Sequence, residues 1–315
     1  MHPYLNRARA ALLAAALLVP TAACGARDAP APGARPTASS PAARPSGAAR
    51  AVRELARLES AHGVRLGAYA LDTGSGRAVS YRAGERFPSL STFKAIAAAA
   101  VLDRARRERP GLMERTVRWG AADEVANSPV TAGRGRAGMT VAELCRAAVT
   151  RSDNTAGNLL LRQLGGPRGL TAYYRSLGDR TSRLDRWEPE LNDWRPGEPR
   201  DTTTAAAMGA GLRAVAVGDA LAPADRERLN GWLRGTATGG ARIRAGLPRT
   251  WRTGDKTGTN GGAGAANDIA VTRPPSGAPV VVSVFTHRTG GRTGTDDAVL
   301  ARAAAVLVRG LGRTS

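Results

Sequence analysis

The stretch PSLSTFKAIAAAAVLDRARR, residues 88–107, is the feature around which the rest of the chain can be interpreted. Pro88 and Ser89 are typical of a helix start, and the alanine-rich run after them has strong helical propensity. Ser91 and Lys94 are three positions apart, so on a helix they share a face within hydrogen-bond reach. Serine is a poor nucleophile at neutral pH unless a neighbouring base takes its proton. The pattern indicates a candidate nucleophile and its base.

Lysine usage gives this pair more weight. The chain has only two lysines, Lys94 and Lys256, although lysine and arginine together number 46. Arginine stays protonated in proteins, whereas a buried lysine can shift its pKa. The two retained lysines therefore mark two places where arginine would not serve. Taken alone, the S-x-x-K spacing is a modest signal, expected by chance in roughly one such sequence in ten.

The composition is that of a globular protein, with 42% hydrophobic and 23% charged residues, but the net charge is +20. A basic chain raises the possibility of nucleic-acid binding. Against it, the arginines are scattered and aromatic residues are only 4%. Compositional bias and surface solvation account for the charge, and we expect no nucleic-acid partner. We also expect no metal and no cofactor, because the three histidines lie far apart without ligand spacing: His2, His62 and His287.

Residues 1–23 have the pattern of a secretory signal, with Arg7 and Arg9 followed by the apolar run ALLAAALLV and the small residues TAA. Cys24 follows directly, so the stretch resembles a bacterial lipoprotein signal with Cys24 as the lipidated residue. Thr21 departs from that pattern, because leucine is usual there. The alternative is ordinary secretion. We expect an exported protein, either lipid-anchored on the outer side of the cell membrane through Cys24 or secreted.

The remaining chain divides by composition and periodicity. Residues 24–46 are rich in Ala, Pro and Ser and predict a disordered linker. Residues 47–315 predict one catalytic domain of the α+β class. Its two ends, 47–86 and 236–315, predict an antiparallel sheet flanked by helices, and the middle, 87–235, predicts an all-helical lobe. Within the two ends, residues 63–72 and 77–82 predict a hairpin, and residues 296–312 predict an apolar-faced helix. A ligand site is expected in the cleft between the lobes.

Three further motifs follow in order along the chain. Residues 152–154 (SDN) lie between two helical runs, residues 187–192 (WEPELN) lie in a polar, proline-rich loop, and residues 256–258 (KTG) end a predicted strand. Each alone also fits an ordinary role, as a helix N-cap, a solvated loop acid or a strand end. Their occurrence together with S-x-x-K is far rarer than any single match.

In this order the motifs resemble those of class A serine β-lactamases, a family for which S-x-x-K, S-D-N and K-T-G are signatures shared with penicillin-binding proteins. The resemblance runs from about residue 49 to the C-terminus. It implies that Ser91 is the acylated nucleophile and that Lys94 accepts or relays its proton. Glu188, with Asn192, would activate the water that hydrolyses the acyl-enzyme. Ser152 would protonate the departing lactam nitrogen.

The same resemblance implies a set of substrate contacts. Asn154 would bind Lys94 and the side-chain amide of the substrate. Lys256 and Thr257, helped by Arg242, would hold its carboxylate. The substrate is expected to be a β-lactam, a penicillin or a cephalosporin, and the enzyme a monomer. The substrate-binding positions implied in this way are Asn154, Asn192, Arg242, Lys256, Thr257, Gly258 and Thr259.

Two supporting features are also implied by the resemblance. The backbone N–H groups of Ser91 and Thr259 would form an oxyanion hole. Arg186 and Asp201 would pair across the loop that carries Glu188, and the Pro189 peptide bond would be cis.

The sequence departs from the family pattern at several positions. Asn127 stands where an aromatic residue commonly walls the substrate entrance. Cys145 matches a family cysteine whose occasional partner position is Ala98 here, so a buried free thiol is expected. The disulfide of some carbapenem-hydrolysing relatives cannot form, because Leu90 and Asn260 occupy its positions. Carbapenem hydrolysis is therefore not supported.

Two alternatives remain open at this point. A penicillin-binding DD-peptidase would share the acylation step but lack an efficient deacylating water, and the acid Glu188 favours the hydrolase. A non-catalytic basic surface lipoprotein would account for the charge and the signal, but not for four motifs in order.

Overall fold

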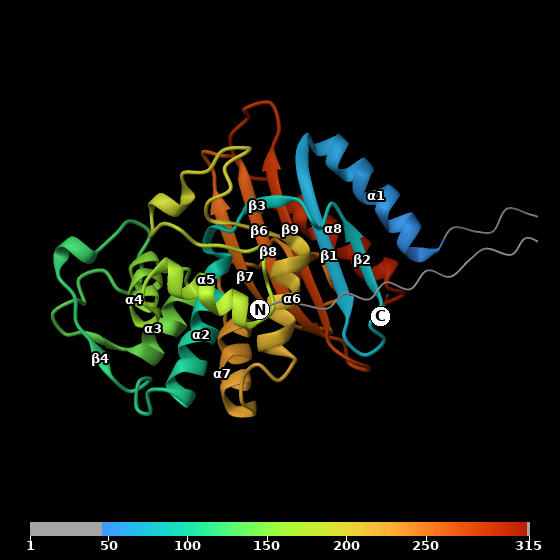
Figure 1. Cartoon of the computed structure of the whole chain (residues 1–315). Helices are drawn as coiled ribbons and strands as arrows, with labels where there is room; N and C mark the ends of the chain where they lie inside the picture. The colour runs from blue at the N-terminus through green and yellow to red at the C-terminus, as the bar shows by residue number, and fades with distance from the viewer. Residues whose placement is uncertain (1–45, 314–315) are drawn as a thin grey trace, which may run out of the picture. The chain divides into compact units, whose positions relative to one another are not determined.

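The computed structural model describes residues 46–313 of the chain (Figure 1). The predicted signal, Cys24 and nearly all of the predicted linker lie outside the described residues. Within residues 46–313, no helix is long and apolar enough to cross a membrane.

A five-stranded antiparallel sheet joins the two ends of the catalytic region, in the order β2-β1-β9-β8-β7. The N-terminal strands form the predicted hairpin, and β1 pairs along its whole length with the late strand β9. The prediction of one sheet built from both ends of the sequence is confirmed. The strands are β1 (Val64–Asp72), β2 (Ala78–Tyr81), β7 (Arg252–Asn260), β8 (Ala265–Arg273) and β9 (Val280–Arg288).

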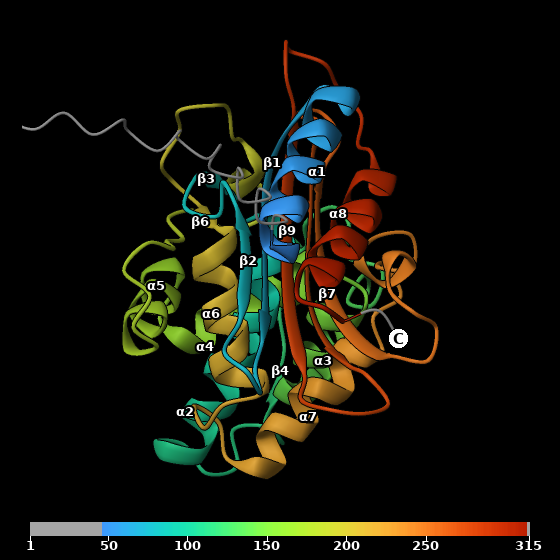
Figure 2. The same cartoon turned by 90° about the vertical axis from the view of Figure 1, so that its right-hand side faces the viewer.

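Helices cover both faces of this sheet because its central strands are apolar on both sides. Along β9, Val281 and Phe285 pack into the core towards the helical lobe, while Val282 and Val284 pack into a second core on the opposite face. This alternation is the period of two expected of a strand. On the second face lie the first and last helices, α1 (Gly47–His62) and α8 (Asp297–Gly310), packed against each other (Figure 2).

The middle of the sequence forms the predicted helical lobe. The alanine-rich helix α2 is its centre: Ile96, Val101 and Leu102 are almost fully buried, and α2 contacts α3, α4, α5, α6 and α7. The small alanine side chains let these neighbours approach closely. The helices are α2 (Phe93–Arg107), α3 (Val141–Thr150), α4 (Asn154–Leu164), α5 (Pro167–Ser176), α6 (Ala205–Ala216) and α7 (Pro223–Arg234).

Short elements connect the larger ones and carry several site residues. Two two-stranded ladders form, one between β3 and β6 and one between β4 and β5. These elements are β3 (Arg86–Pro88), β4 (Thr116–Val117), β5 (Met139–Thr140), β6 (Thr202–Thr204) and the 3₁₀ turns η1 (Leu90–Thr92), η2 (Ala121–Asp123), η3 (Glu190–Asn192) and η4 (Ile243–Gly246).

Two local predictions were wrong. Pro88 does not start a helix: it ends β3, Ser91 lies in η1, and α2 begins at Phe93. Residues 86–88, just before η1, form β3 and pair with β6. This contact is between residues far apart in the sequence, so local helix and strand propensities cannot predict it. Nor does β7 end at Gly258, because its ladder with β8 continues to the pair Asn260–Ala265.

Candidate active site

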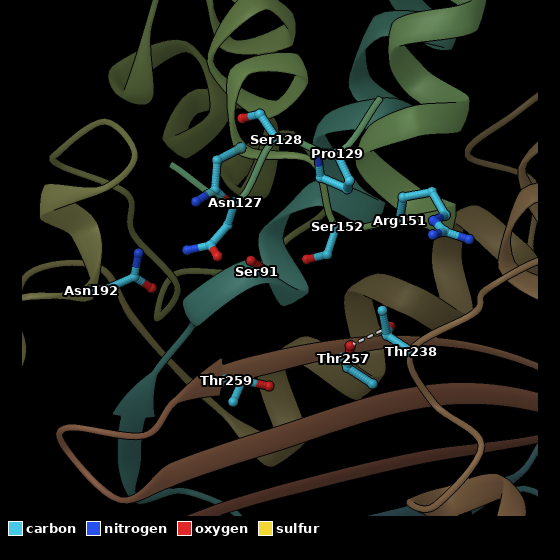
Figure 3. A pocket seen from close by; sticks show the side chains of 11 residues that line it. Ser91, Asn127, Ser128, Pro129, Arg151, Ser152, Asn192, Thr238, Thr257 and Thr259 are labelled. Atoms are coloured by element: carbon cyan, nitrogen blue, oxygen red, sulfur yellow. Dashed lines mark hydrogen bonds between the residues drawn. The ribbon is translucent and has the colours of Figure 1, made fainter. Parts of the chain in front are cut away.

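A cavity of about 700 Å³ opens between the helical lobe and the edge strand β7 (Figure 3). It receives side chains from η1, the loop before α4, the loop carrying η3, and β7. Six of the residues implied by the sequence line it directly, which confirms the expected cleft. The lining residues are Ser91, Asn127, Ser128, Pro129, Arg151, Ser152, Asn154, Asn192, Thr238, Thr257 and Thr259.

Ser91 lies in η1, at the entrance to α2. The Lys94 Nζ donates a hydrogen bond to its Oγ at 3.0 Å, so the predicted same-face pair is in contact. Strand β7 approaches closely from the other side. A Cβ added at Gly258 would lie 2.9 Å from Leu90 Cβ and 3.3 Å from Ser91 N, so only glycine permits this contact.

Lys94 is fully buried, and its amine is surrounded by oxygen atoms. Besides Ser91, its Nζ donates to Ser152 O at 2.9 Å and to Asn154 Oδ1 at 2.5 Å. Its fourth partner is Glu188 Oε1 at 2.9 Å. A lysine ammonium has three N–H donors, so the four oxygens share them. The predicted contact between Asn154 and Lys94 is confirmed.

Glu188 is the second buried charge beside Ser91, with 2% of its surface exposed. Its Oε1 lies 3.5 Å from Ser91 Oγ, and its Oε2 accepts a hydrogen bond from Asn192 Nδ2 at 2.6 Å. Asn158 on α4 fixes the backbone, accepting from Glu188 N at 2.9 Å and donating to Glu188 O at 2.8 Å. The Glu188–Pro189 peptide bond is cis, as predicted.

The loop carrying Glu188 is closed at its base by Asp201. The Asp201 carboxylate is fully buried and accepts from the backbone N–H groups of Asp185 at 2.7 Å and Arg186 at 2.9 Å. Its other oxygen accepts from Arg186 Nε at 2.6 Å. The predicted Arg186–Asp201 pair is confirmed.

Ser152 and Lys256 meet from opposite lobes. The Lys256 Nζ donates to Ser152 Oγ at 3.0 Å and to Thr257 O at 2.7 Å. Ser152 has a positive φ of 56°, which places its side chain in the cleft just before Asp153 caps α4. The helix-cap role and a role in the site therefore belong to adjacent residues of one motif.

Electrostatics prepare the β7 side of the cavity for an anion. Lys256 is fully buried, and this burial, followed by the positive charge of Lys94, lowers the pKa of Lys256 well below its ordinary value of 10.5. An anion bound beside Lys256 would favour its charged form and would itself be stabilised.

Arg242, like Lys256, does not line the cavity directly, and only 4% of it is exposed. Its Nη1 donates to Gly258 O and Asn267 O, both at 2.8 Å, and its Nη2 donates to Thr259 Oγ1 at 2.8 Å. The guanidinium therefore lies behind β7, with the Thr259 hydroxyl between it and the cavity.

The departures from the family pattern also have structural counterparts. Asn127 lines the cavity with a φ of 60°, a conformation that asparagine tolerates well. Cys145 is a buried free thiol, as predicted, and its burial raises the pKa of the thiol. Asn260 Nδ2 donates to Asn192 O at 2.6 Å, joining β7 to the loop of Glu188.

Sequence reasoning missed three residues that shape the site. Asn158 holds the Glu188 backbone, Thr238 shares a hydrogen bond of 2.6 Å between its Oγ1 and that of Thr257, and Arg151 lines the cavity. Arg151 directly precedes the SDN motif, and this position in the sequence could have identified it as a residue near the site. Asn158 and Thr238 carry no local pattern that distinguishes them.

Comparison with known proteins agrees with this geometry. The model of the β-lactamase enzyme family matches residues 49–311. The chain belongs to this family. The β-lactamase AST-1 of Nocardia asteroides is 49% identical over 310 residues, covering 98% of this chain and 96% of the relative. The β-lactamase FAR-1 of Nocardia farcinica is 50% identical, covering 96% of each.

Solved structures resemble this β-lactamase over most of the described chain. A β-lactamase from Streptosporangium roseum is 58% identical with a TM-score of 0.83, covering 84% of this chain and all of that one. A reconstructed ancestral class A β-lactamase is 53% identical with a TM-score of 0.77, covering 81% of this chain and 98% of that one. The family is thus class A, with a serine nucleophile, and the predicted fold class is confirmed.

Proposed function

We propose that this class A β-lactamase hydrolyses the β-lactam ring of penicillins and cephalosporins through an acyl-enzyme on Ser91. Ring opening inactivates the antibiotic, so the reaction confers resistance on the cell. The observation that carries the residue assignment is that a buried amine, Lys94, and a buried carboxylate, Glu188, both lie beside the hydroxyl of Ser91, which lines the cavity.

Acylation begins when Ser91 Oγ attacks the lactam carbonyl carbon. Its proton passes to the Lys94–Glu188 pair, whose nearest atoms lie 3.0 and 3.5 Å from Oγ. The backbone N–H groups of Ser91 and Thr259 are assigned to the oxyanion that forms on the carbonyl oxygen. The C–N bond then breaks, leaving an ester on Ser91.

The departing lactam nitrogen needs a proton. We assign its delivery to Ser152, whose Oγ is already held at 3.0 Å by the Lys256 amine. The hydroxyl gives its proton to nitrogen and takes one from the Lys256 amine, which regains a proton from water in the cavity. The Lys94–Glu188 pair releases the proton of Ser91 to the same water, so that Glu188 is again a carboxylate for deacylation. Ser152 touches both buried lysines, Lys256 through its hydroxyl and Lys94 through its backbone carbonyl.

Deacylation is assigned to Glu188. Its carboxylate is oriented by Asn192 and Lys94 and faces Ser91, so it can take a proton from a water that attacks the ester carbonyl. The proton returns to Ser91 Oγ as the ester breaks and the opened product leaves. A general base contributes roughly 10²–10⁴-fold to such a step.

The carboxylate of the substrate is assigned to the β7 edge, at Lys256 and the Thr257 hydroxyl. Arg242 supports this subsite through the Thr259 hydroxyl rather than by direct contact. Asn154, which lines the cavity, is assigned to the side-chain amide at the other end.

Nitrocefin turnover tests the proposed function. Wild type should hydrolyse it continuously, and Ser91→Ala should lose activity by about 10⁴-fold or more because no covalent intermediate can form. A wild-type protein that binds nitrocefin covalently and stops after one turnover would instead be a penicillin-binding DD-peptidase. Absence of both turnover and adduct would contradict either enzyme.

We also propose that the enzyme is exported and lipid-anchored through Cys24, on the strength of the sequence pattern of residues 1–24. Metabolic labelling with palmitate should mark wild type and leave Cys24→Ser unmarked. Equal labelling of the two would contradict the anchor.

A further inference from the structure

Arg151 is a cation at the cavity whose charge nothing in residues 46–313 neutralises. It directly precedes Ser152, lines the cavity and is exposed. Its side chain makes neither an ion pair nor a side-chain hydrogen bond within the described part of the chain, although 19 ion pairs form there. A neighbouring surface hollow is lined by Arg151 together with Arg134 and Arg146, and its one acid, Glu143, is engaged by Thr140.

Arg151 lies at the end of the cavity assigned to the substrate carboxylate. Figure 3 shows Arg151 and Thr238 at one end of the cavity, with Asn127 and Asn192 at the other and Ser91 between them. Thr238 is hydrogen-bonded to Thr257, the residue assigned to the substrate carboxylate. Arg151 therefore lies at the carboxylate end, on the side of the helical lobe.

In a cephalosporin, the C3 substituent is attached to the ring carbon next to the one that bears the carboxylate. A carboxylate held at Thr257 thus directs the C3 substituent towards the end of the cavity occupied by Thr238 and Arg151. A substituent with a positive charge would meet an unpaired guanidinium there, and one with a negative charge would be attracted.

We propose that Arg151 is a specificity-determining residue that selects cephalosporins by the charge of their C3 substituent, disfavouring cationic substituents and favouring anionic ones. This inference rests on the proposed function, because it requires the substrate orientation assigned there. Arg151 also ends α3 as its C-cap, where a positive charge is favourable to the helix. A purely helix-stabilising role would not discriminate between substrates.

The inference is tested by comparing two cephalosporins that have the same thienylacetyl side chain and differ in the charge of the C3 substituent. Cephalothin carries a neutral acetoxymethyl group at C3, and cephaloridine carries a cationic pyridinium. The quantity measured is the ratio of kcat/KM for the cationic substrate to kcat/KM for the neutral one. Because both values come from one preparation, the fraction of folded enzyme cancels.

Arg151→Met should raise this ratio by about two- to fivefold, the effect of one exposed charge. Arg151→Lys should retain the wild-type ratio, and Arg151→Glu should raise it further. The matched control is Arg146→Met, which removes the same charge five residues earlier, on α3 and outside the cavity, and should leave the ratio unchanged. Salt near 1 M should reduce the difference between wild type and Arg151→Met, because the Debye length falls to about 3 Å.

An unchanged ratio in Arg151→Met, or an equal change in Arg146→Met, would overturn the inference while leaving the proposed function intact. Failure of the wild type to hydrolyse any β-lactam would contradict the proposed function instead.

Discussion

The two lysines of this chain occupy sites that an arginine could not fill. Lys94, whose side chain is fully buried, brings a single nitrogen within 3.0 Å of Ser91 Oγ and 2.9 Å of Glu188 Oε1. A guanidinium is larger and planar and does not give up a proton in this range. Lys256 places an equally compact charge against Ser152. Residue chemistry therefore explains the lysine usage that the sequence shows.

A pair of buried acids lies behind Lys256 on the sheet. Asp255 and Asp268 are both fully buried, and each has one carboxylate oxygen without a hydrogen-bond partner. Burial, and then the negative charge of Asp255, raises the pKa of Asp268 well above its ordinary value of 3.8. The folded protein therefore keeps a proton on Asp268 at a pH where the unfolded chain has lost it.

This shift predicts a pH-dependent difference in stability between wild type and Asp268→Asn. The stability that Asp268 contributes is complete below pH 3.8 and is lost as the pH rises through the folded pKa. The amide is a neutral isostere and does not titrate. The free energy of unfolding of wild type minus that of the variant should therefore fall with rising pH, by up to about 1.4 kcal/mol per pH unit for one proton.

Urea denaturation at a series of pH values from 4 to 8 measures this difference. Asp225→Asn, at an exposed ion pair on α7, serves as the control. A difference for Asp268→Asn that is flat, or that rises with pH, would contradict the account of the buried acids.

At the level of single residues, the structure brings together the residues that the sequence motifs singled out. Ser91, Lys94, Ser152, Glu188 and Lys256 could be found because their motifs are short and local. The depth of Arg242 could not be predicted, because its guanidinium is held by the backbone carbonyls of Gly258 on β7 and Asn267 on β8. That depth follows from packing and has no local signal.

The element that positions Lys94 is α4, which packs across α2 without a side chain at Gly157. A Cβ there would lie 2.8 Å from Lys94 Cε. Gly157→Ala should raise helix propensity by up to about 1 kcal/mol but displace the amine from Ser91. We expect acylation to slow by tenfold to a hundredfold, the effect of a displacement of about 1 Å.

Stopped-flow acylation rates together with the melting temperature separate these two effects. The control is Gly211→Ala on α6, where the new Cβ would contact only Ile96, at 3.9 Å. Equal activity of Gly157→Ala and wild type would show that this helix contact does not position Lys94.

The loop carrying Glu188 depends on the charge of Asp201. Asp201→Asn keeps an acceptor for two backbone N–H groups but loses the ion pair with Arg186. We expect a loss of stability of about 1–3 kcal/mol and slower deacylation, because Glu188 and Asn192 lose their fixed position. Acylation should change less, since Lys94 is held by α2 and α4. Pre-steady-state kinetics would show a burst followed by slow turnover, and the absence of a burst would contradict this role for the loop.

The sequence predicted the main helices and strands but misplaced some of their ends. The hairpin of β1 and β2 and the helix α8 were predictable from strong periodicity. The start of α2 was not predictable, because Pro88 pairs as part of a strand with Thr202, which lies far along the chain. Long-range pairing of this kind cannot be derived from local propensity.

At the scale of the molecule, the two lobes share one of the two hydrophobic cores, the one between the sheet and the helical lobe. Phe87 and the helices of the helical lobe form one cluster with Ile269, Val281 and Phe285 of the sheet. Asn267 on β8 also donates to Pro88 O at 2.7 Å, just before Ser91. The cleft therefore does not divide the protein into two independently folding parts, and we expect both lobes to unfold together.

The shared core predicts that both lobes unfold in one transition. Far-UV circular dichroism, tryptophan fluorescence and nitrocefin activity should give the same midpoint in urea. Activity lost well before the helical signal would indicate that the lobes separate independently and would contradict a common core.

The most direct test of the account is the intact mass of Glu188→Ala after mixing with benzylpenicillin. The variant should gain the mass of one whole penicillin, on the peptide that contains Ser91, and keep it for hours, while wild type returns to its original mass as product accumulates. A variant that turns over like wild type, or that never becomes acylated, would contradict the assignment of Glu188 to deacylation.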